Sequence, residues 1–171
     1  IMYSPEFGVI NLLLESLLGI RGPRWLASSG WALPSLIVMS TWGFGGSMII
    51  FLAGLQGVPQ HLYEAAEIDG ASASTRFFNI TLPMMTPAVF YVMTTGIIAA
   101  FQTFTQAYVM TRGGPGNATM LFALYLYNNA FAFYRMGYAS ALAWVLFLVV
   151  LVVTIVQFKI AAHWVYYEVE A

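Results

Sequence analysis

The sequence predicts an all-α, polytopic integral membrane protein. Of its 171 residues, 60% are hydrophobic and only 8% are charged, whereas about a quarter of the residues in a soluble domain are charged. Three apolar runs are each long enough to cross a bilayer as a helix, which takes about 20 residues. None of these runs contains Asp, Glu, Lys, Arg or His. We therefore expect three transmembrane helices joined by loops.

The residues before the first apolar run are mixed in polarity. Residues 9–18 can form a helix, but Asn11 and Glu15 interrupt its apolar surface and the segment is too short to span a bilayer. We expect an interfacial helix followed by a loop. Trp25 and Trp31 then stand where amphipathic rings favour the headgroup layer.

The three spans are predicted over residues 34–56, 84–110 and 137–158. At 1.5 Å per residue, each covers the hydrocarbon thickness of about 30 Å. The apolar segment over 120–134 is only about 15 residues long, so we expect it to lie in the interface or to re-enter partway. Residues 111–135 are accordingly predicted as an external loop with an interfacial helix, in which Asn117 or Thr119 can cap the helix. Residues 159–171 are predicted as a tail.

A polar segment over residues 58–83 separates the first two spans, and its first part predicts a short amphipathic helix. Pro59 suits the first helical position, where its missing N–H costs nothing. Leu62, Ala65 and Ala66 are then expected on the apolar face of this helix.

The second part of this segment predicts a sharp corner. Gly70 suits the left-handed conformation that ends a helix, and Ser72 can cap a second helical turn. Phe77 and Phe78 follow as compact apolar anchors for a partner. Because three of the chain's seven acidic residues also lie here, we expect a docking surface in water.

Seven residues of this segment have a fixed spacing: Glu64, Ala65, Ala66, Gly70, Ile80, Leu82 and Pro83. The pattern resembles the cytoplasmic E-A-A loop of the permease subunits of binding-protein-dependent ABC importers. Further stretches are most similar to the sugar-importing branch of that family: residues 31–34, 51–56, 108–111, 113–115 and 137–141.

The resemblance implies a fold, a function and a set of partners. Residues 1–171 would form a partial permease domain, the C-terminal three-span part of a type I importer permease. The chain would not be an enzyme and would bind no cofactor, because a separate ABC ATPase dimer would use ATP. Other partners would be a second, different permease chain, a soluble solute-binding protein and the lipid of a prokaryotic cytoplasmic membrane. The residues implied to dock the ATPase are Glu64, Ala65, Ala66, Asp69, Gly70, Phe77 and Phe78.

Amide side chains suggest a substrate path. Gln102 and Gln106 are four residues apart, so they would share one face of the second predicted span, and Asn128 is a further candidate. Amides beside aromatic rings suit a sugar, because amides bind hydroxyl groups and rings cover the apolar faces of a pyranose. Hydrogen bonding between helices is the alternative role for these amides.

Composition and missing motifs exclude several other classes. A net charge of −1 offers no basic patch for nucleic acid, and the absence of cysteine excludes disulfides and thiol chemistry. We find no Walker A motif, metal motif or catalytic constellation. A permease for a non-sugar solute, a channel and a secondary transporter remain alternatives. The lack of ionisable residues in the spans argues against a self-powered transporter.

Charge counting and the E-A-A resemblance predict opposite orientations. Three crossings place residues 58–83, here called the docking segment, on the same side of the membrane as the tail. This side carries two basic residues, Arg76 and Lys159. Four arginines lie on the other side: Arg21, Arg24, Arg112 and Arg135. The positive-inside rule would therefore place the docking segment outside the cell. We follow the resemblance, which places it in the cytoplasm, because the first helices of a chain usually set its orientation.

Overall fold

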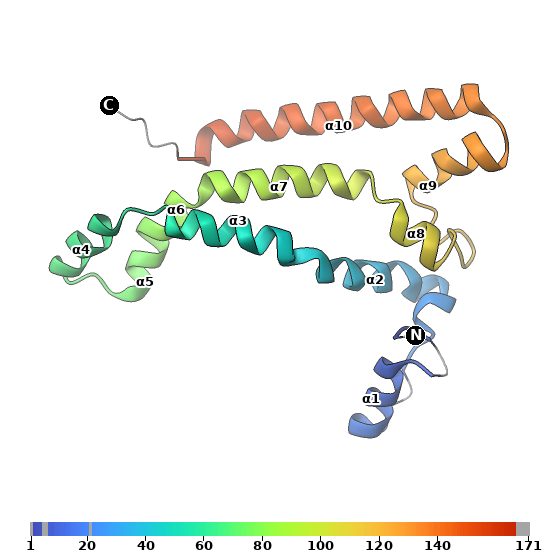
Figure 1. The fold of residues 1–171 in the computed structure, drawn as a ribbon, viewed down its shortest axis with the longest axis horizontal. Helices are drawn as coiled ribbons and strands as arrows, with labels where there is room; N and C mark the ends of the chain where they lie inside the picture. The colour runs from blue at the N-terminus through green and yellow to red at the C-terminus, as the bar shows by residue number, and fades with distance from the viewer. Residues whose placement is uncertain (1, 5–6, 21, 167–171) are drawn as a thin grey trace. The chain divides into compact units, whose positions relative to one another are not determined.

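The computed structural model describes residues 2–4, 7–20 and 22–166, and every regular element in those ranges is helical (Figure 1). The predicted all-α fold is confirmed. The chain divides into two compact units, which are described separately. Unit 1 comprises Ile1–Gly43 with Ala100–Phe147, and unit 2 comprises Phe44–Ala99 with Leu148–Ala171.

Most of the elements are α-helices: α1 (Val9–Leu18), α2 (Ser29–Ser40), α3 (Gly45–Gln56), α4 (Gln60–Ile68), α5 (Ala73–Arg76), α6 (Leu82–Met84), α7 (Thr86–Phe101), α8 (Thr105–Met110), α9 (Phe122–Tyr127) and α10 (Met136–Trp164). Two short 3₁₀-helices are η1 (Trp25–Ala27) and η2 (Thr41–Phe44). Two π-helical turns are η3 (Phe77–Thr81) and η4 (Asn128–Ala132).

Among the described residues, two helical stretches are long and apolar enough to cross a membrane. Ser29–Gln56 is 28 residues long and is built from α2, η2 and α3, and Met136–Trp164 is 29 residues long. The first stretch begins before the predicted start at residue 34, so Pro34 lies inside the helix rather than at its beginning. The second encloses the span predicted over 137–158.

The second predicted span is not one continuous helix. The helical stretches Ala73–Met84 and Thr86–Phe101 meet at a bend of 59° and form a span only if the pair is counted together. The helix then ends at Phe101, and residues 102–104 are not helical before α8 begins. Residues 84–110, predicted as one span, are thus helical over Thr86–Phe101 and again over Thr105–Met110, with a break at residues 102–104. Apolar composition alone does not show where tertiary contacts interrupt a helix.

In unit 2, α7 packs against α3 and against the last part of α10 (Figure 1). A Cβ atom at Gly54 of α3 would lie only 3.0 Å from the sulfur of Met85 and 3.2 Å from the Cβ of Ala88, so this glycine permits close approach of the two helices. The ring of Phe90 on α7 meets the ring of Phe158 on α10 edge to face, with the two centroids 5.1 Å apart.

Two polar side chains in unit 2 are buried without a hydrogen bond to any described residue: the Thr94 hydroxyl and the Gln157 amide. A buried amide that lacks partners costs about 1–3 kcal/mol. We therefore expect Gln157→Leu to raise the thermal midpoint of the complete permease in nanodiscs. Gln56→Leu, at an exposed amide, is the control and should leave the midpoint unchanged. A lower midpoint for Gln157→Leu would mean that the amide has a stabilising partner.

In unit 1, Leu36, Ala107 and Leu124 form the buried core. The loop after α8 is closed by Thr119, which is fully buried and donates a hydrogen bond to the Gly114 carbonyl at 2.8 Å. Because the Thr119 hydroxyl is used inside the loop, it does not cap α9. That helix begins after Leu121 without a side-chain cap, so the predicted capping by Asn117 or Thr119 is wrong.

Candidate functional site

The predicted corner between α4 and α5 is present, and backbone hydrogen bonds define its shape. Gly70 has a φ of +73°, in the left-handed region. Its N–H donates to the Glu67 carbonyl at 3.0 Å, and the Ala71 N–H donates to the Ala66 carbonyl at 2.9 Å. This pair of bonds is a Schellman motif, which requires a residue such as glycine in the left-handed position. The corner is therefore a defined end of α4.

The second half of the corner begins as predicted at Ser72. Its side chain caps α5 by accepting a hydrogen bond from the Thr75 N–H at 3.2 Å. Across the corner, Arg76 forms an ion pair with Glu67 at 3.5 Å. Exposed ion pairs of this kind contribute little to stability, so the backbone motif and the cap carry most of the geometry.

The position of α4 is fixed by a hydrogen bond on its inner side. The Tyr63 hydroxyl lies 2.7 Å from the hydroxyl of Thr81, which is buried. This contact turns Tyr63 inward together with Leu62 and Ala66, whereas Ala65 is exposed. The prediction that Ala65 lies on the apolar face is therefore wrong, because a tyrosine bond and not apolarity alone sets the rotation of this helix.

Pro59 is also one position away from its predicted place. It has an extended ψ of 129° and precedes the first residue of α4, so it occupies the N-cap rather than the first helical position. The helix nevertheless starts next to this proline, as the sequence suggests.

Six of the seven residues predicted to dock an ATPase are exposed, and Ala66 is half-buried. The exposed residues are Glu64, Ala65, Asp69, Gly70, Phe77 and Phe78. The two phenylalanine rings meet edge to face at 5.2 Å. Both acidic and aromatic groups are thus presented on one corner of unit 2.

Ile68 extends this exposed surface and was not predicted from the sequence. It is the last residue of α4, and 88% of its surface is exposed. A large aliphatic side chain at the polar end of an amphipathic helix is the signal that would have identified it. We call Glu64, Ile68, Asp69, Phe77 and Phe78, with the Gly70 turn, the docking corner.

The three predicted substrate-path amides all lie in unit 1, but they are not placed as expected. Gln102 lies in the break between α7 and α8, while Gln106 is exposed on α8. The prediction that they share a helix face is therefore wrong. Asn128 is half-buried at the end of α9, and its amide donates to the sulfur of Met120 at 3.6 Å.

An aromatic cluster lies in the same unit as these amides. Phe104 stacks on Tyr108 with a centroid distance of 5.1 Å and contacts Tyr127 at 4.9 Å. Tyr127 also contacts Phe131 at 5.0 Å. The packing of Phe104 into this cluster accompanies its non-helical backbone, with φ −127° and ψ −55°, and accounts for the break before α8.

The Tyr127 hydroxyl of this cluster is neutral at physiological pH. Hydrogen bonding to Tyr108 raises the pKa of Tyr127 above its ordinary value. An uncharged group of rings and hydroxyls is compatible with a neutral polyhydroxylated solute and offers no charge to an ion.

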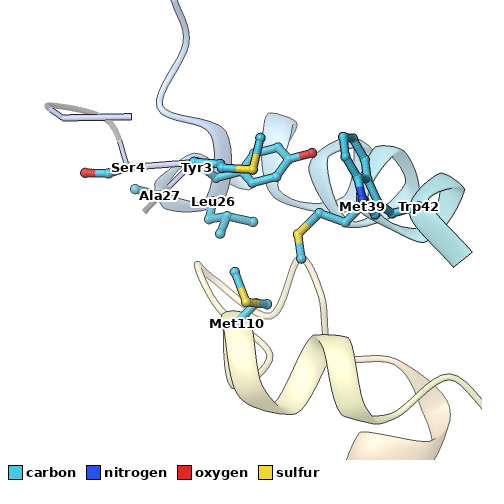
Figure 2. Close-up of a pocket in the computed structure, with 8 residues that line it drawn as sticks. Tyr3, Ser4, Leu26, Ala27, Met39, Trp42 and Met110 are labelled. Atoms are coloured by element: carbon cyan, nitrogen blue, oxygen red, sulfur yellow. The ribbon is translucent and has the colours of Figure 1, made fainter. Parts of the chain in front are cut away.

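A separate cavity of about 600 Å³ lies in unit 1 (Figure 2). It is lined by Met2, Tyr3, Ser4, Leu26, Ala27, Met39, Trp42 and Met110. Figure 2 shows Leu26, Met39 and Met110 around it, from η1, α2 and α8. The lining is mostly apolar and does not include the predicted amides.

Comparison with known proteins gives matches over nearly the whole chain. A family model described as binding-protein-dependent transport system inner membrane component matches residues 1–164. The probable ABC transporter permease protein YesP of Bacillus subtilis is 47% identical over 163 residues, covering 94% of this chain and 53% of YesP. The sulfoquinovosyl glycerol transport system permease protein SmoG of Agrobacterium fabrum is 42% identical over 156 residues, covering 91% of this chain and 50% of SmoG. The chain thus spans about half the length of these curated relatives.

A solved structure has the same fold. It is the crystal structure of a bacterial ABC transporter involved in the import of the acidic polysaccharide alginate, and one of its chains matches with a TM-score of 0.83 and 23% identity. The match covers 95% of this chain and 57% of that chain. Since the helical fold agrees and the family model covers residues 1–164, the chain belongs to the inner membrane components of binding-protein-dependent transport systems.

Proposed function

We propose that this chain belongs to the transmembrane subunit of an ATP-driven sugar importer in the cytoplasmic membrane of a prokaryote. A separate ABC ATPase dimer binds the docking corner and hydrolyses ATP, so this chain needs no cofactor of its own. A second permease chain completes the translocation path, and a soluble binding protein delivers the sugar from outside.

The observation that carries this proposal is the exposed docking corner beside helices that are long enough to span a membrane. Its acidic, aliphatic and aromatic groups face solvent at a rigid turn, although burying Ile68 or Phe78 would be favourable. Exposed apolar groups on a polar surface are typical of a binding interface. The family membership and the name of SmoG support an ATPase as the partner and a carbohydrate derivative as the solute.

Reconstituted transport tests the proposed function. The complete permease, its ATPase and its binding protein are placed in proteoliposomes, and uptake of a panel of tritiated oligosaccharides is measured with ATP or a non-hydrolysable analogue. We expect accumulation only with ATP. Uptake that persists with the analogue would indicate a channel, and uptake that follows a proton gradient would indicate a secondary transporter.

Gln102→Ala tests the predicted substrate path. Because Gln102 is exposed in a helix break, its amide is available to a solute, and we expect slower oligosaccharide uptake with normal assembly of the complex. Loss of one hydrogen bond to a neutral group corresponds to a decrease of roughly 2- to 10-fold in apparent affinity. Assembly is measured by size-exclusion chromatography. If the Gln102→Ala complex does not assemble, the amide forms hydrogen bonds between helices instead of binding sugar.

A further inference from the structure

Two prolines remove backbone hydrogen bonds at the bend between α6 and α7. In a continuous α-helix, the Pro83 carbonyl would accept a hydrogen bond from the N–H of residue 87, but residue 87 is also a proline and has no N–H. The helices bend by 59° at this point, and Met85 between them is buried. The Pro83 carbonyl instead accepts a hydrogen bond from a backbone N–H at the C-terminal cap of α6.

The Thr86 side chain gives this carbonyl a second donor and also accepts a hydrogen bond from a distant part of unit 2. Its hydroxyl donates to the Pro83 carbonyl at 2.6 Å and accepts from the backbone N–H of Tyr166 at 2.9 Å. A hydroxyl can donate once and accept at the same time, so the two bonds are compatible. Tyr166 is 80 residues away in sequence, just beyond the end of α10. One side chain thus joins the docking segment, α7 and the end of α10.

Aromatic contacts with α10 hold the α7 side of this bend. Phe90, one turn into α7, contacts the rings of Phe158 and Trp164 on α10 at 5.1 Å and 6.3 Å. Beside the bend lies a cavity of about 260 Å³ lined by Gly54, Gly57, Val58, Met84, Pro87 and Tyr166. This space would allow the bend angle to change if the Thr86 bonds were lost.

We infer that Thr86 is a positioning residue that locks the bend, so that the docking corner, α7 and the end of α10 move as one body. The inference rests on the proposed function, in which an ATPase moves the docking corner. Without the Thr86 hydroxyl, the docking segment would turn at Met85 and its motion would not reach α7. ATP hydrolysis would then continue while transport decreased.

Spin labels can measure this bend directly, because residues 1–171 contain no cysteine and any cysteine elsewhere in the complete permease or the ATPase can be replaced by serine. Labels are attached to Ala73→Cys and His163→Cys, two exposed positions on α5 and at the end of α10. The distance distribution is recorded by pulsed electron resonance on the complete permease with its ATPase in nanodiscs, without nucleotide and with ATP and vanadate. For the protein that carries only the two labels, called the unchanged protein below, we expect one narrow distance distribution. It should be the same without nucleotide and with ATP and vanadate.

Thr86→Val keeps the shape of the side chain but removes its hydroxyl. We expect the population with an altered bend to increase about tenfold, as for the loss of one to two hydrogen bonds, and ATP to shift the distance. Oligosaccharide uptake per ATP hydrolysed should fall. Thr86→Ser restores the hydroxyl and should restore both measurements.

Two controls separate the bend from general effects on the helices. Thr95→Val removes a hydroxyl whose bonds are to Tyr91 and Val92 of its own helix, and it should resemble the unchanged protein. Tyr166→Pro removes the N–H that Thr86 accepts and should resemble Thr86→Val, whereas Tyr166→Ala keeps this N–H and should not.

The inference is wrong if Thr86→Val has the same distance distribution as the unchanged protein in both nucleotide states. It is equally wrong if Thr95→Val broadens the distance distribution as much as Thr86→Val does. It is also wrong if ATP shifts the distance in the unchanged protein as much as in Thr86→Val. Failure of the ATPase to bind would instead contradict the proposed function. In that case the comparison without nucleotide would still decide whether Thr86 holds the bend.

Discussion

Gly70→Val is expected to abolish the coupling of ATP hydrolysis to transport while leaving membrane insertion intact. Gly70 has a φ of +73°, which a β-branched residue adopts only with strain of about 1–3 kcal/mol. Valine would therefore disrupt the two backbone bonds that end α4 and would reorient Glu64, Ile68 and Asp69. The spans lie outside this turn, so the amount of permease in the membrane should not change. Uptake and ATP hydrolysis are measured in the same proteoliposomes.

Gly70→Asn is the matched control, because asparagine tolerates the left-handed conformation better than other residues with side chains. It should keep most of the coupling. No described atom lies within 4 Å of a Cβ placed at Gly70, so backbone conformation and not a steric clash should separate the two variants. Normal transport by Gly70→Val would show that the geometry of the corner does not matter.

Phe78→Ala is expected to weaken ATPase binding by about 30-fold or more, as for truncation of an aromatic residue at the centre of an interface. Its ring is 63% exposed and lies against Phe77, so removing it should cost little folding energy. Binding of the purified ATPase to the permease in nanodiscs is measured by biolayer interferometry.

Phe147→Ala is the control for this variant. Phe147 is similarly exposed, at 53%, but lies on the apolar helix α10, so its truncation should leave ATPase binding unchanged. If both variants bind equally well, the aromatic residues of the docking corner do not anchor the ATPase.

Features that depend on neighbouring residues in the sequence were predicted most accurately. The helix expected over residues 9–18 corresponds to α1 at both ends. The left-handed Gly70 and the Ser72 cap were also predicted correctly, because turns and caps are formed by residues a few positions apart. The turn geometry of the docking corner could therefore be predicted from the sequence, whereas its exposed residue Ile68 was not identified.

Features that depend on distant residues were missed. The helix break at Gln102 accompanies packing of Phe104 against Tyr127 of α9, and the rotation of α4 depends on the bond between Tyr63 and Thr81. The contact of Thr86 with Tyr166 joins the two chain segments that form unit 2. No local pattern identifies such partners, although Pro83 and Pro87 do indicate that the regular helical hydrogen bonds are interrupted at this point.

The most direct test concerns the side of the membrane on which the docking corner lies. Ile68→Cys introduces an exposed thiol into residues 1–171, which contain no cysteine, and any cysteine elsewhere in the permease is replaced by serine. A membrane-impermeant maleimide is then applied to intact cells and to inside-out vesicles. We predict labelling only in the vesicles and protection when the ATPase is bound. Labelling in intact cells would place the corner outside, as the arginine distribution suggests, and would contradict the proposed docking of an ATPase.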